Sequence, residues 1–171
     1  MLTPTILFLD DQLVAHQRTV LQRYLNVFQQ LNIDLLEVSD INLMYDKLKE
    51  YQEQGKTIHG FLIDLMLPQC QPKMNFAAWG VPSLSLNHSI GGAQVIKLMR
   101  HEYYEDERNN PAHPLHIMQY FKDAKIALFT TYEDGEAVMR HQGIATVCYF
   151  LYKDQKNIEE LLTKWIQSCN P

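Results

Sequence analysis

Short runs of consecutive apolar residues alternate along this chain with longer stretches in which apolar residues recur every three or four positions. The short runs are typical of parallel strands buried on both faces, and the longer stretches are typical of helices with one apolar face. Five strands are predicted, at residues 6–9, 34–38, 60–64, 125–131 and 147–152. Five helices are predicted, at residues 20–31, 41–48, 92–100, 133–141 and 158–166.

The regular alternation of strands and helices predicts an α/β fold. Strands that are joined through helices run parallel, and the right-handed crossovers place the helices against the faces of the sheet. Functional residues of such a sheet gather outside the carboxyl ends of its strands. At 171 residues, the chain is expected to form a single domain, residues 1–171.

Two stretches, at about residues 69–90 and 101–124, are much longer than ordinary connections, since loops in α/β units usually take roughly 2–6 residues. We expect both to be insertions that are either packed or mobile. Residues 75–92 contain large apolar side chains but no Asp, Glu, Lys or Arg. This segment is therefore expected either to pack back onto the domain or to form a surface for a partner or a second copy.

The overall composition is typical of a globular protein and disfavours a nucleic-acid-binding or membrane-spanning one. Apolar residues make up 46% of the chain and charged residues 20%, and the net charge of −5 gives no basic surface for nucleic acid or an anionic membrane. The apolar runs are too short to span a membrane, and the first residues lack the pattern of a signal peptide. Three widely spaced cysteines, Cys70, Cys148 and Cys169, are expected to stay reduced in the cytoplasm.

Ionisable and hydroxyl side chains follow several of the predicted strands. Asp10 and Asp11 follow the first strand, Asp64 ends the third, Thr130 lies at the end of the fourth, and Lys153 follows the fifth. Taken alone, the two adjacent acids are most simply solvated turn residues. Three carboxylates at one edge of a sheet raise one another's pKa unless a cation neutralises them, and Mg²⁺ prefers such oxygen ligands. The complete set therefore indicates a cation site.

A carboxylate at such a site can attack a phosphoryl group and form an aspartyl phosphate. Asp64 is the expected nucleophile. The charge that develops on the phosphoryl oxygens requires Mg²⁺, a cationic side chain and a hydroxyl donor. Lys153 and Thr130 would supply the last two, although Thr130 alone could instead cap the following helix.

Five motifs stand in order along the chain. They are FLDD (8–11), LIDLMLP (62–68), GGAQVIKLMR (91–100), ALFTT (127–131) and YFLYK (149–153). This ordered set resembles the receiver domain of bacterial response regulators, the CheY-like fold, over almost the whole chain apart from the two expected insertions. The resemblance implies a three-layer, doubly wound, five-stranded parallel sheet with the flavodoxin-like order 2-1-3-4-5 and helices on both faces.

The resemblance also implies a role for each residue of the site. Asp64 would be the phosphoacceptor and would receive its phosphoryl group from a histidine kinase or a histidine phosphotransfer protein. Asp11 would bind Mg²⁺ (or Mn²⁺) directly, Asp10 would help through a water molecule, and the main-chain carbonyl of Met66 would be a further ligand. Lys153 would pair with the phosphoryl group.

A conformational switch is the expected output of this resemblance. On phosphorylation Thr130 would turn inward and Phe150 would follow it, which would change a surface that binds a downstream protein. Phe150 taken alone is more simply a core residue. The protein is not expected to be an enzyme beyond its own phosphotransfer and slow dephosphorylation, and it could form a homodimer.

Several positions depart from the family pattern. Asp154 follows the lysine where the family has a proline in a cis peptide, so we expect a trans bond. The lysine side chain is then expected either to lie differently from the family's or to be partly drawn towards Asp154. Thr131, which is also expected to tune dephosphorylation, is bulkier than the family's usual residue. Met66 and Tyr132 occupy two positions that tune dephosphorylation, and neither can hold a hydrolytic water as an acid or amide would. We therefore expect slow loss of phosphate.

Two other functions fit parts of the pattern. A degenerate receiver would keep the fold and act as a phosphorylation-independent interaction module. The missing proline and the apolar insertion favour this alternative, and the complete set of acids, hydroxyl and lysine disfavours it. A phosphatase of the haloacid-dehalogenase class also uses an aspartyl nucleophile, but that class needs an acid two places after its first-strand aspartate, where this chain has Gln12.

Overall fold

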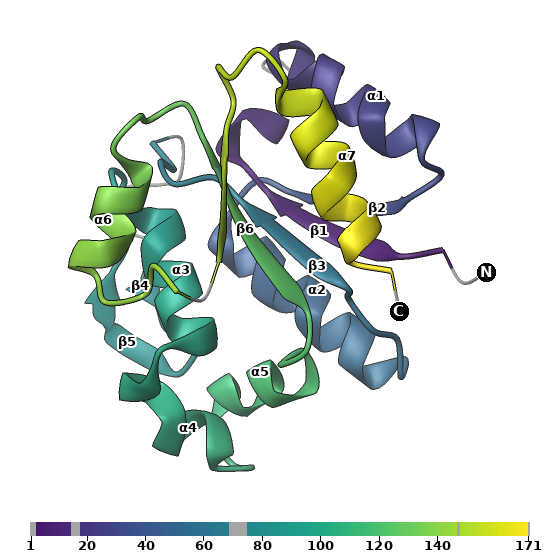
Figure 1. Cartoon of the computed structure of the whole chain (residues 1–171). Helices are drawn as coiled ribbons and strands as arrows, with labels where there is room; N and C mark the ends of the chain where they lie inside the picture. Colours follow the sequence, from purple (N-terminus) through teal and green to yellow (C-terminus); the bar gives the residue numbers. More distant parts are fainter. Residues whose placement is uncertain (1–2, 15–17, 69–74, 147, 171) are drawn as a thin grey trace.

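The computed structural model describes residues 3–14, 18–68, 75–146 and 148–170 of the chain. Within these residues, five parallel strands form the main sheet in the order β2-β1-β3-β6-β7 (Figure 1). The strands are β1 (Thr5–Leu9), β2 (Asp34–Val38), β3 (Gly60–Ile63), β6 (Lys125–Thr130) and β7 (Tyr149–Tyr152). Counted along the chain, this is the order 2-1-3-4-5, so the predicted sheet is confirmed.

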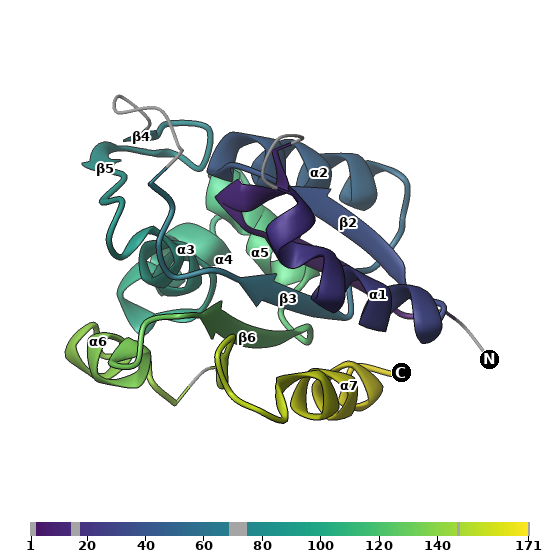
Figure 2. The same ribbon diagram turned by 90° about the horizontal axis from the view of Figure 1, so that it is seen from above.

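Helices cover both faces of this sheet, which confirms the predicted three-layer architecture. On one face lie α1 (Gln22–Gln30) and α7 (Ile158–Ser168), and on the other lie α2 (Ile41–Glu53), α3 (Gly91–Arg100) and α6 (Gly135–His141) (Figures 1 and 2). The side chain of Asp40 caps α2 by accepting hydrogen bonds from two main-chain amides. Short 3-10 turns at Asp11–Leu13 and Arg18–Leu21 precede α1.

Alternate residues of each strand face opposite helical layers, which explains the unbroken apolar runs in the sequence. In β1, Ile6 and Phe8 belong to the apolar core beneath α1 and α7, whereas Leu7 and Leu9 belong to the core beneath α2 and α3. All four side chains are fully buried. A strand that is covered on both faces has no polar side, so its sequence shows no alternation.

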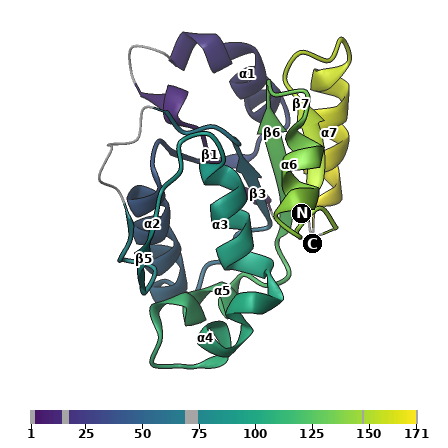
Figure 3. The ribbon, with the colours of Figure 1, turned by 90° about the vertical axis from the view of Figure 1, so that its left-hand side faces the viewer.

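The described part of the first long stretch packs against the domain. A two-stranded antiparallel hairpin is formed by β4 (Asn75–Phe76) and β5 (Val81–Ser85), and Figure 3 shows β5 beside α2. Phe76 and Trp79 are fully buried, and the Trp79 indole N–H donates a hydrogen bond to the Ile41 carbonyl at the start of α2 (3.2 Å). The prediction that this apolar segment packs back is confirmed for residues 75–90. Residues 69–74 lie outside the described part of the chain.

The second long stretch forms short helices beside the amino ends of the strands, low in Figure 1. They are the 3-10 turns Glu102–Tyr104 and Pro114–His116, α4 (Glu105–Asn109) and α5 (Ile117–Tyr120). The Arg100 guanidinium at the end of α3 donates to the carbonyls of Phe121 and Ala124, both at 2.9 Å. Arg108 donates to the His101 carbonyl at 2.8 Å. These bonds fix the second long stretch to α3.

Cys148 and Cys169 carry free thiols, and Cys70 lies outside the described residues. Burial raises the pKa of the Cys148 thiol to about 12 and that of the Cys169 thiol to about 11. Both groups therefore remain protonated and weakly nucleophilic at neutral pH. Among the helices of the described residues, none has the length and apolar character needed to cross a membrane.

Candidate functional site

The three acids picked out in the sequence meet at the carboxyl edge of the sheet. Asp10 and Asp11 follow β1, Asp64 follows β3, and these strands pair with Leu9 level with Ile63. The main-chain amide of Asp64 donates to the Leu9 carbonyl at 2.8 Å, which fixes the acid at the strand end. One carboxylate oxygen from each acid lies within 4.8 Å of the others, and all three residues are buried.

Lys153 extends from the end of β7 into this acid cluster. Its ammonium nitrogen lies 2.7 Å from Asp10 Oδ2 and 3.0 Å from Asp64 Oδ1. The same nitrogen lies 5.2 Å from the ring centroid of Phe129. The expectation that the side chain is drawn towards Asp154 is wrong, because the buried carboxylates attract the ammonium group more strongly than an exposed acid does.

The main chain of Lys153 is held from two sides. Its N–H donates to the Thr130 carbonyl of β6 (2.8 Å), and its carbonyl accepts from the Tyr24 hydroxyl (2.9 Å) and from Arg23 Nη2 (2.6 Å). Among the described residues no peptide bond is cis, so the expected trans bond to Asp154 is confirmed. Sequence reasoning missed Arg23 and Tyr24, since both belong to a helix whose apolar spacing explains Tyr24 as a core residue.

Charge and burial set the ionisation of the cluster. Burial raises the pKa of the Asp64 carboxyl to about 7; Lys153 acts against this rise, and the Asp10 and Asp11 carboxylates add to it. Burial lowers the pKa of the Lys153 ammonium, but the Asp64 and Asp10 carboxylates together outweigh burial and leave the pKa above its ordinary value. Lys153 is therefore a cation at neutral pH, whereas Asp64 takes up a proton readily.

Thr130 lies at the end of β6, next to the cluster along the sheet. It is buried, and its hydroxyl oxygen accepts a hydrogen bond from the Tyr132 amide (3.1 Å). The alternative that Thr130 caps the next helix is wrong, because α6 begins only at Gly135. Phe150 is half-buried and packs against the core beneath α2 and α3. Its position fits both a core residue and a residue that moves with Thr130.

The three positions predicted to tune dephosphorylation are exposed near the acids. Met66 and Tyr132 are 38% and 44% exposed, and Thr131 is exposed as well. Met66 and Tyr132 line a hollow of about 220 Å³ together with Ser89, Ile90 and Val138. Two large side chains from the segments that follow β3 and β6 therefore share this hollow.

Gly92 allows α3 to begin directly behind Asp64. Its amide donates to the Leu65 carbonyl (3.0 Å), and a Cβ atom at this position would lie only 2.0 Å from the main-chain oxygen of Asp64. The expected helix at residues 92–100 did not by itself indicate this contact. A glycine in the first turn of a helix that follows an acidic strand end is the sequence feature that could have indicated it.

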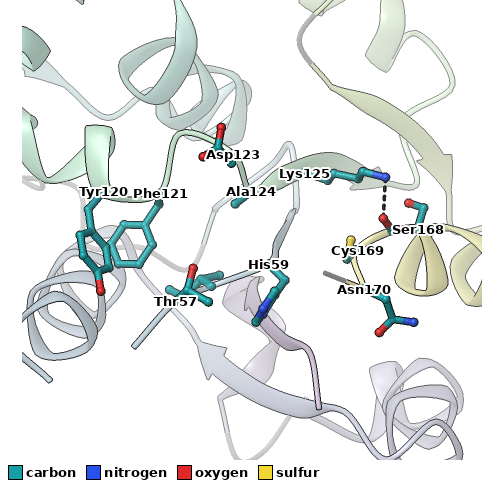
Figure 4. Close-up of a pocket in the computed structure, with 11 residues that line it drawn as sticks. Thr57, His59, Tyr120, Phe121, Asp123, Ala124, Lys125, Ser168, Cys169 and Asn170 are labelled. Carbon is teal, nitrogen blue, oxygen red and sulfur yellow. Dashed lines mark hydrogen bonds between the residues drawn. The ribbon is translucent and has the colours of Figure 1, made fainter. Parts of the chain in front are cut away.

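A separate hollow of about 250 Å³ lies at the opposite, amino edge of the sheet (Figure 4). Two of its polar side chains, Lys125 and His59, are bonded to main-chain atoms. Lys125 Nζ donates to the Ser168 carbonyl (2.5 Å), and His59 Nδ1 accepts from the Thr5 amide (3.0 Å). The acid cluster is therefore the arrangement that matches the chemistry predicted from the sequence.

The donor set of the acid cluster fits a hard divalent cation. Asp10, Asp11 and Asp64 offer carboxylate oxygens close together, and Mg²⁺ is usually bound by one or a few carboxylates with water and phosphate oxygens completing its shell. Neither the nitrogen nor the thiolate ligands that zinc prefers are part of this cluster.

The chain resembles known proteins in structure and not in sequence. No protein-family model matches the sequence, and no curated protein matches it. A response regulator from Thermotoga maritima superposes with a TM-score of 0.56 at 12% identity, over 98% of each chain. The BeF₃-activated receiver domain of DrrB superposes with a TM-score of 0.51 at 14% identity, over 98% of this chain and 97% of that domain.

The fold is that of a response-regulator receiver domain. At these identities the likeness is one of fold, and it confirms at that level the resemblance first based on the five motifs. The buried cluster of Asp10, Asp11 and Asp64 lies where the carboxyl ends of the central strands meet, and it resembles a receiver-domain metal site.

Proposed function

We propose that this chain is a phosphoacceptor receiver domain of a two-component or phosphorelay system. Asp64 takes a phosphoryl group from a phosphohistidine on a histidine kinase or a histidine phosphotransfer protein. The observation that supports this most strongly is the contact between Lys153 Nζ and Asp64 Oδ1 (3.0 Å) inside a buried cluster of acids. Folding joins these two residues across 89 positions of sequence, and the pair combines an acceptor carboxylate with a cation for phosphoryl oxygens.

The chemical step is a substitution at phosphorus. A carboxylate oxygen of Asp64 attacks the phosphorus atom, the P–N bond of the phosphohistidine breaks, and its electron pair remains on the imidazole nitrogen. Lys153 releases Asp64 Oδ1 and donates to a phosphoryl oxygen. The Thr130 hydroxyl, which now accepts from the Tyr132 amide, turns to donate to another phosphoryl oxygen. No enzyme activity beyond this self-catalysed transfer and slow hydrolysis is required.

Asp10, Asp11, Asp64 and the Met66 carbonyl would hold Mg²⁺ or Mn²⁺. When bound, the ion supplies positive charge that stabilises the carboxylates and the developing charge on the phosphoryl oxygens. Asp10 already shares Lys153 with Asp64, and its other oxygen accepts from the Gln12 amide (2.9 Å), so its position in the cluster is fixed.

The output is a change in a protein-binding surface. Movement of Thr130 towards the phosphoryl group draws Phe150 with it, because the two residues lie on the neighbouring strands β6 and β7. The surface formed by β6, α6 and β7 then binds a downstream protein in one state and not in the other.

Mass spectrometry of the intact protein tests this function. The chain is incubated with phosphoramidate and Mg²⁺, with EDTA in a parallel sample. We expect a gain of one phosphoryl group in the wild type with Mg²⁺, and none with EDTA or in Asp64→Asn. An unmodified wild type would contradict the proposal.

The second candidate is a pseudo-receiver that acts as an interaction module without phosphorylation. The burial of Asp64, which is only 7% exposed, favours it, since a phosphodonor must reach this carboxylate. Under this alternative the wild type stays unmodified in the same experiment, and Asp64→Asn binds the downstream partner as the wild type does.

A further inference from the structure

We propose that Tyr24 and Arg23 of α1 are positioning residues for Lys153, acting on its main-chain carbonyl. This inference rests on the proposed function, because it assigns to α1 the task of holding the lysine that serves the phosphoryl group. The effect of Tyr24 and Arg23 on the reaction passes through the main chain of Lys153.

The contacts of the carbonyl are close, and the one from Tyr24 is buried. The Tyr24 hydroxyl donates to the Lys153 carbonyl at 2.9 Å, and Tyr24 is only 3% exposed. Arg23 Nη2 donates to the same carbonyl at 2.6 Å and also to the Tyr24 hydroxyl oxygen. The guanidinium carbon of Arg23 lies 4.5 Å from the centroid of the Tyr24 ring, so ring and cation form one unit.

The hydrogen bonds from Tyr24 and Arg23 to the Lys153 carbonyl are called the anchor below. The position of Lys153 in the sheet explains why this anchor is needed. β7 is an edge strand, so β6 is its partner on one side and no strand of the described sheet pairs with its other side. The residues that follow, 154–157, are all exposed and offer little packing. The Lys153 amide is bonded to β6, and its carbonyl is bonded to α1. The anchor therefore holds the main chain of Lys153 on the side where no strand of the described sheet pairs with β7.

The position of the main chain controls the reach of the lysine. Its long side chain has several rotatable bonds, and the ammonium group is useful only if it meets both Asp10 and Asp64. Misplacement of a catalytic group by about 1 Å can cost about a hundredfold in rate. Loss of one buried hydrogen bond at the carbonyl is expected to loosen this geometry without removing the charge.

Tyr24→Phe is a clean test, because the ring packs independently of the hydroxyl. The Tyr24 ring lies edge-to-face against Phe129 at 4.8 Å between centroids, and a phenylalanine keeps this contact. The matched control is Tyr51→Phe in the opposite helical layer. Tyr51 is also a buried tyrosine, and its hydroxyl donates to Asp34 (3.3 Å).

The first measurement is the rate of Asp64 labelling by phosphoramidate with Mg²⁺. In Tyr24→Phe the maximal rate is expected to fall about tenfold, which corresponds to about 1.4 kcal/mol and to the upper range of one net hydrogen bond. The phosphoramidate concentration at half-maximal rate should not change, and Tyr51→Phe should label as the wild type does. In a Lys153→Gln background, Tyr24→Phe should slow labelling no further. An equal slowing in both backgrounds would overturn the proposal.

The second measurement does not depend on phosphorylation. Hydrogen exchange of the Lys153 amide, followed by NMR, should be faster in Tyr24→Phe and unchanged in Tyr51→Phe. Unchanged exchange in Tyr24→Phe would overturn the proposal that the Tyr24 hydroxyl holds the main chain of Lys153. Faster exchange in a protein whose wild type cannot be labelled would support the anchor and reject the proposed function, so the two failures can be told apart.

Discussion

Asp64 combines two properties that rarely occur together in an acid at a strand end. It is buried beside two further carboxylates, and it is bonded to a lysine ammonium. Burial has the larger effect and raises its pKa to about 7, so the carboxyl is partly protonated at neutral pH when no metal is bound. A nucleophile must be a carboxylate, and a bound divalent cation would restore that form.

Metal-free stability should depend on pH through Asp64. The pKa of Asp64 is about 7 in the folded protein against an ordinary 3.8, so the folded state binds more protons than the unfolded state between these values. The free energy of unfolding therefore falls as pH rises from about 4 to about 7, by an amount on the order of a few kcal/mol. Lys153, whose pKa is raised, stays charged throughout this window.

Urea denaturation in EDTA at pH 5 and pH 8 checks this dependence. The loss of stability between the two pH values should be smaller in Asp64→Asn, which cannot ionise at this position, than in the wild type. Equal pH dependence in the two proteins would show that Asp64 does not titrate as described.

Slow loss of phosphate is expected from the side chains at the approach to Asp64. Met66, two residues after Asp64, and Tyr132, two residues after Thr130, line one hollow and cannot orient a water molecule as a carboxylate or amide does. Met66→Asn combined with Tyr132→Glu should therefore accelerate dephosphorylation by about tenfold. The decay of the phosphorylated mass gives the rate, and Tyr103→Glu, an exposed tyrosine at the other end of the molecule, serves as control. If the double variant loses phosphate no faster than the wild type, the expectation is contradicted.

At the scale of elements, the sequence predicted best what depends on local pattern. The five main strands and the helices between them follow from apolar periodicity, and the strand-end rule brought Asp10, Asp11, Asp64 and Lys153 to one edge. The β4–β5 hairpin could not be predicted, because its two short strands are stabilised by the burial of Phe76 and Trp79 against distant helices. The contact of Tyr24 with the Lys153 carbonyl was equally hidden, since it joins residues 129 positions apart.

The start of α3 depends on a close approach that only glycine permits. A Cβ atom at Gly92 would lie 2.0 Å from the Asp64 main-chain oxygen, whereas one at Gly91 would meet the ends of the Leu86 and Leu67 side chains, which can move. Gly92→Ala should therefore lower the free energy of unfolding by about 1–3 kcal/mol or more through overpacking.

Gly91→Ala is the matched control for this substitution. Alanine favours helix over glycine by about 1 kcal/mol, which offsets a small side-chain adjustment, so this variant should be near neutral. Chemical denaturation of both variants gives the comparison. Equal stabilities would show that α3 does not approach Asp64 as closely as the structure indicates.

At the scale of the whole molecule, the sheet separates two ends with different roles. The carboxyl edge carries the acid cluster, Lys153 and the approach past Met66 and Tyr132. The amino edge carries the short helices of residues 101–124 and a hollow in which Lys125 is bonded to the Ser168 carbonyl (Figure 4). We propose that phosphorylation at the first edge is transmitted along β6 and β7 to the surface beside α6.

The most direct test of the central claim is to locate the modified residue. The wild type is treated with phosphoramidate and Mg²⁺, and borohydride then reduces any aspartyl phosphate to homoserine, which peptide mass spectrometry can place in the sequence. We expect homoserine at position 64 and none at positions 10 and 11. Homoserine at another aspartate, or none anywhere in a folded protein that binds Mg²⁺, would contradict this expectation.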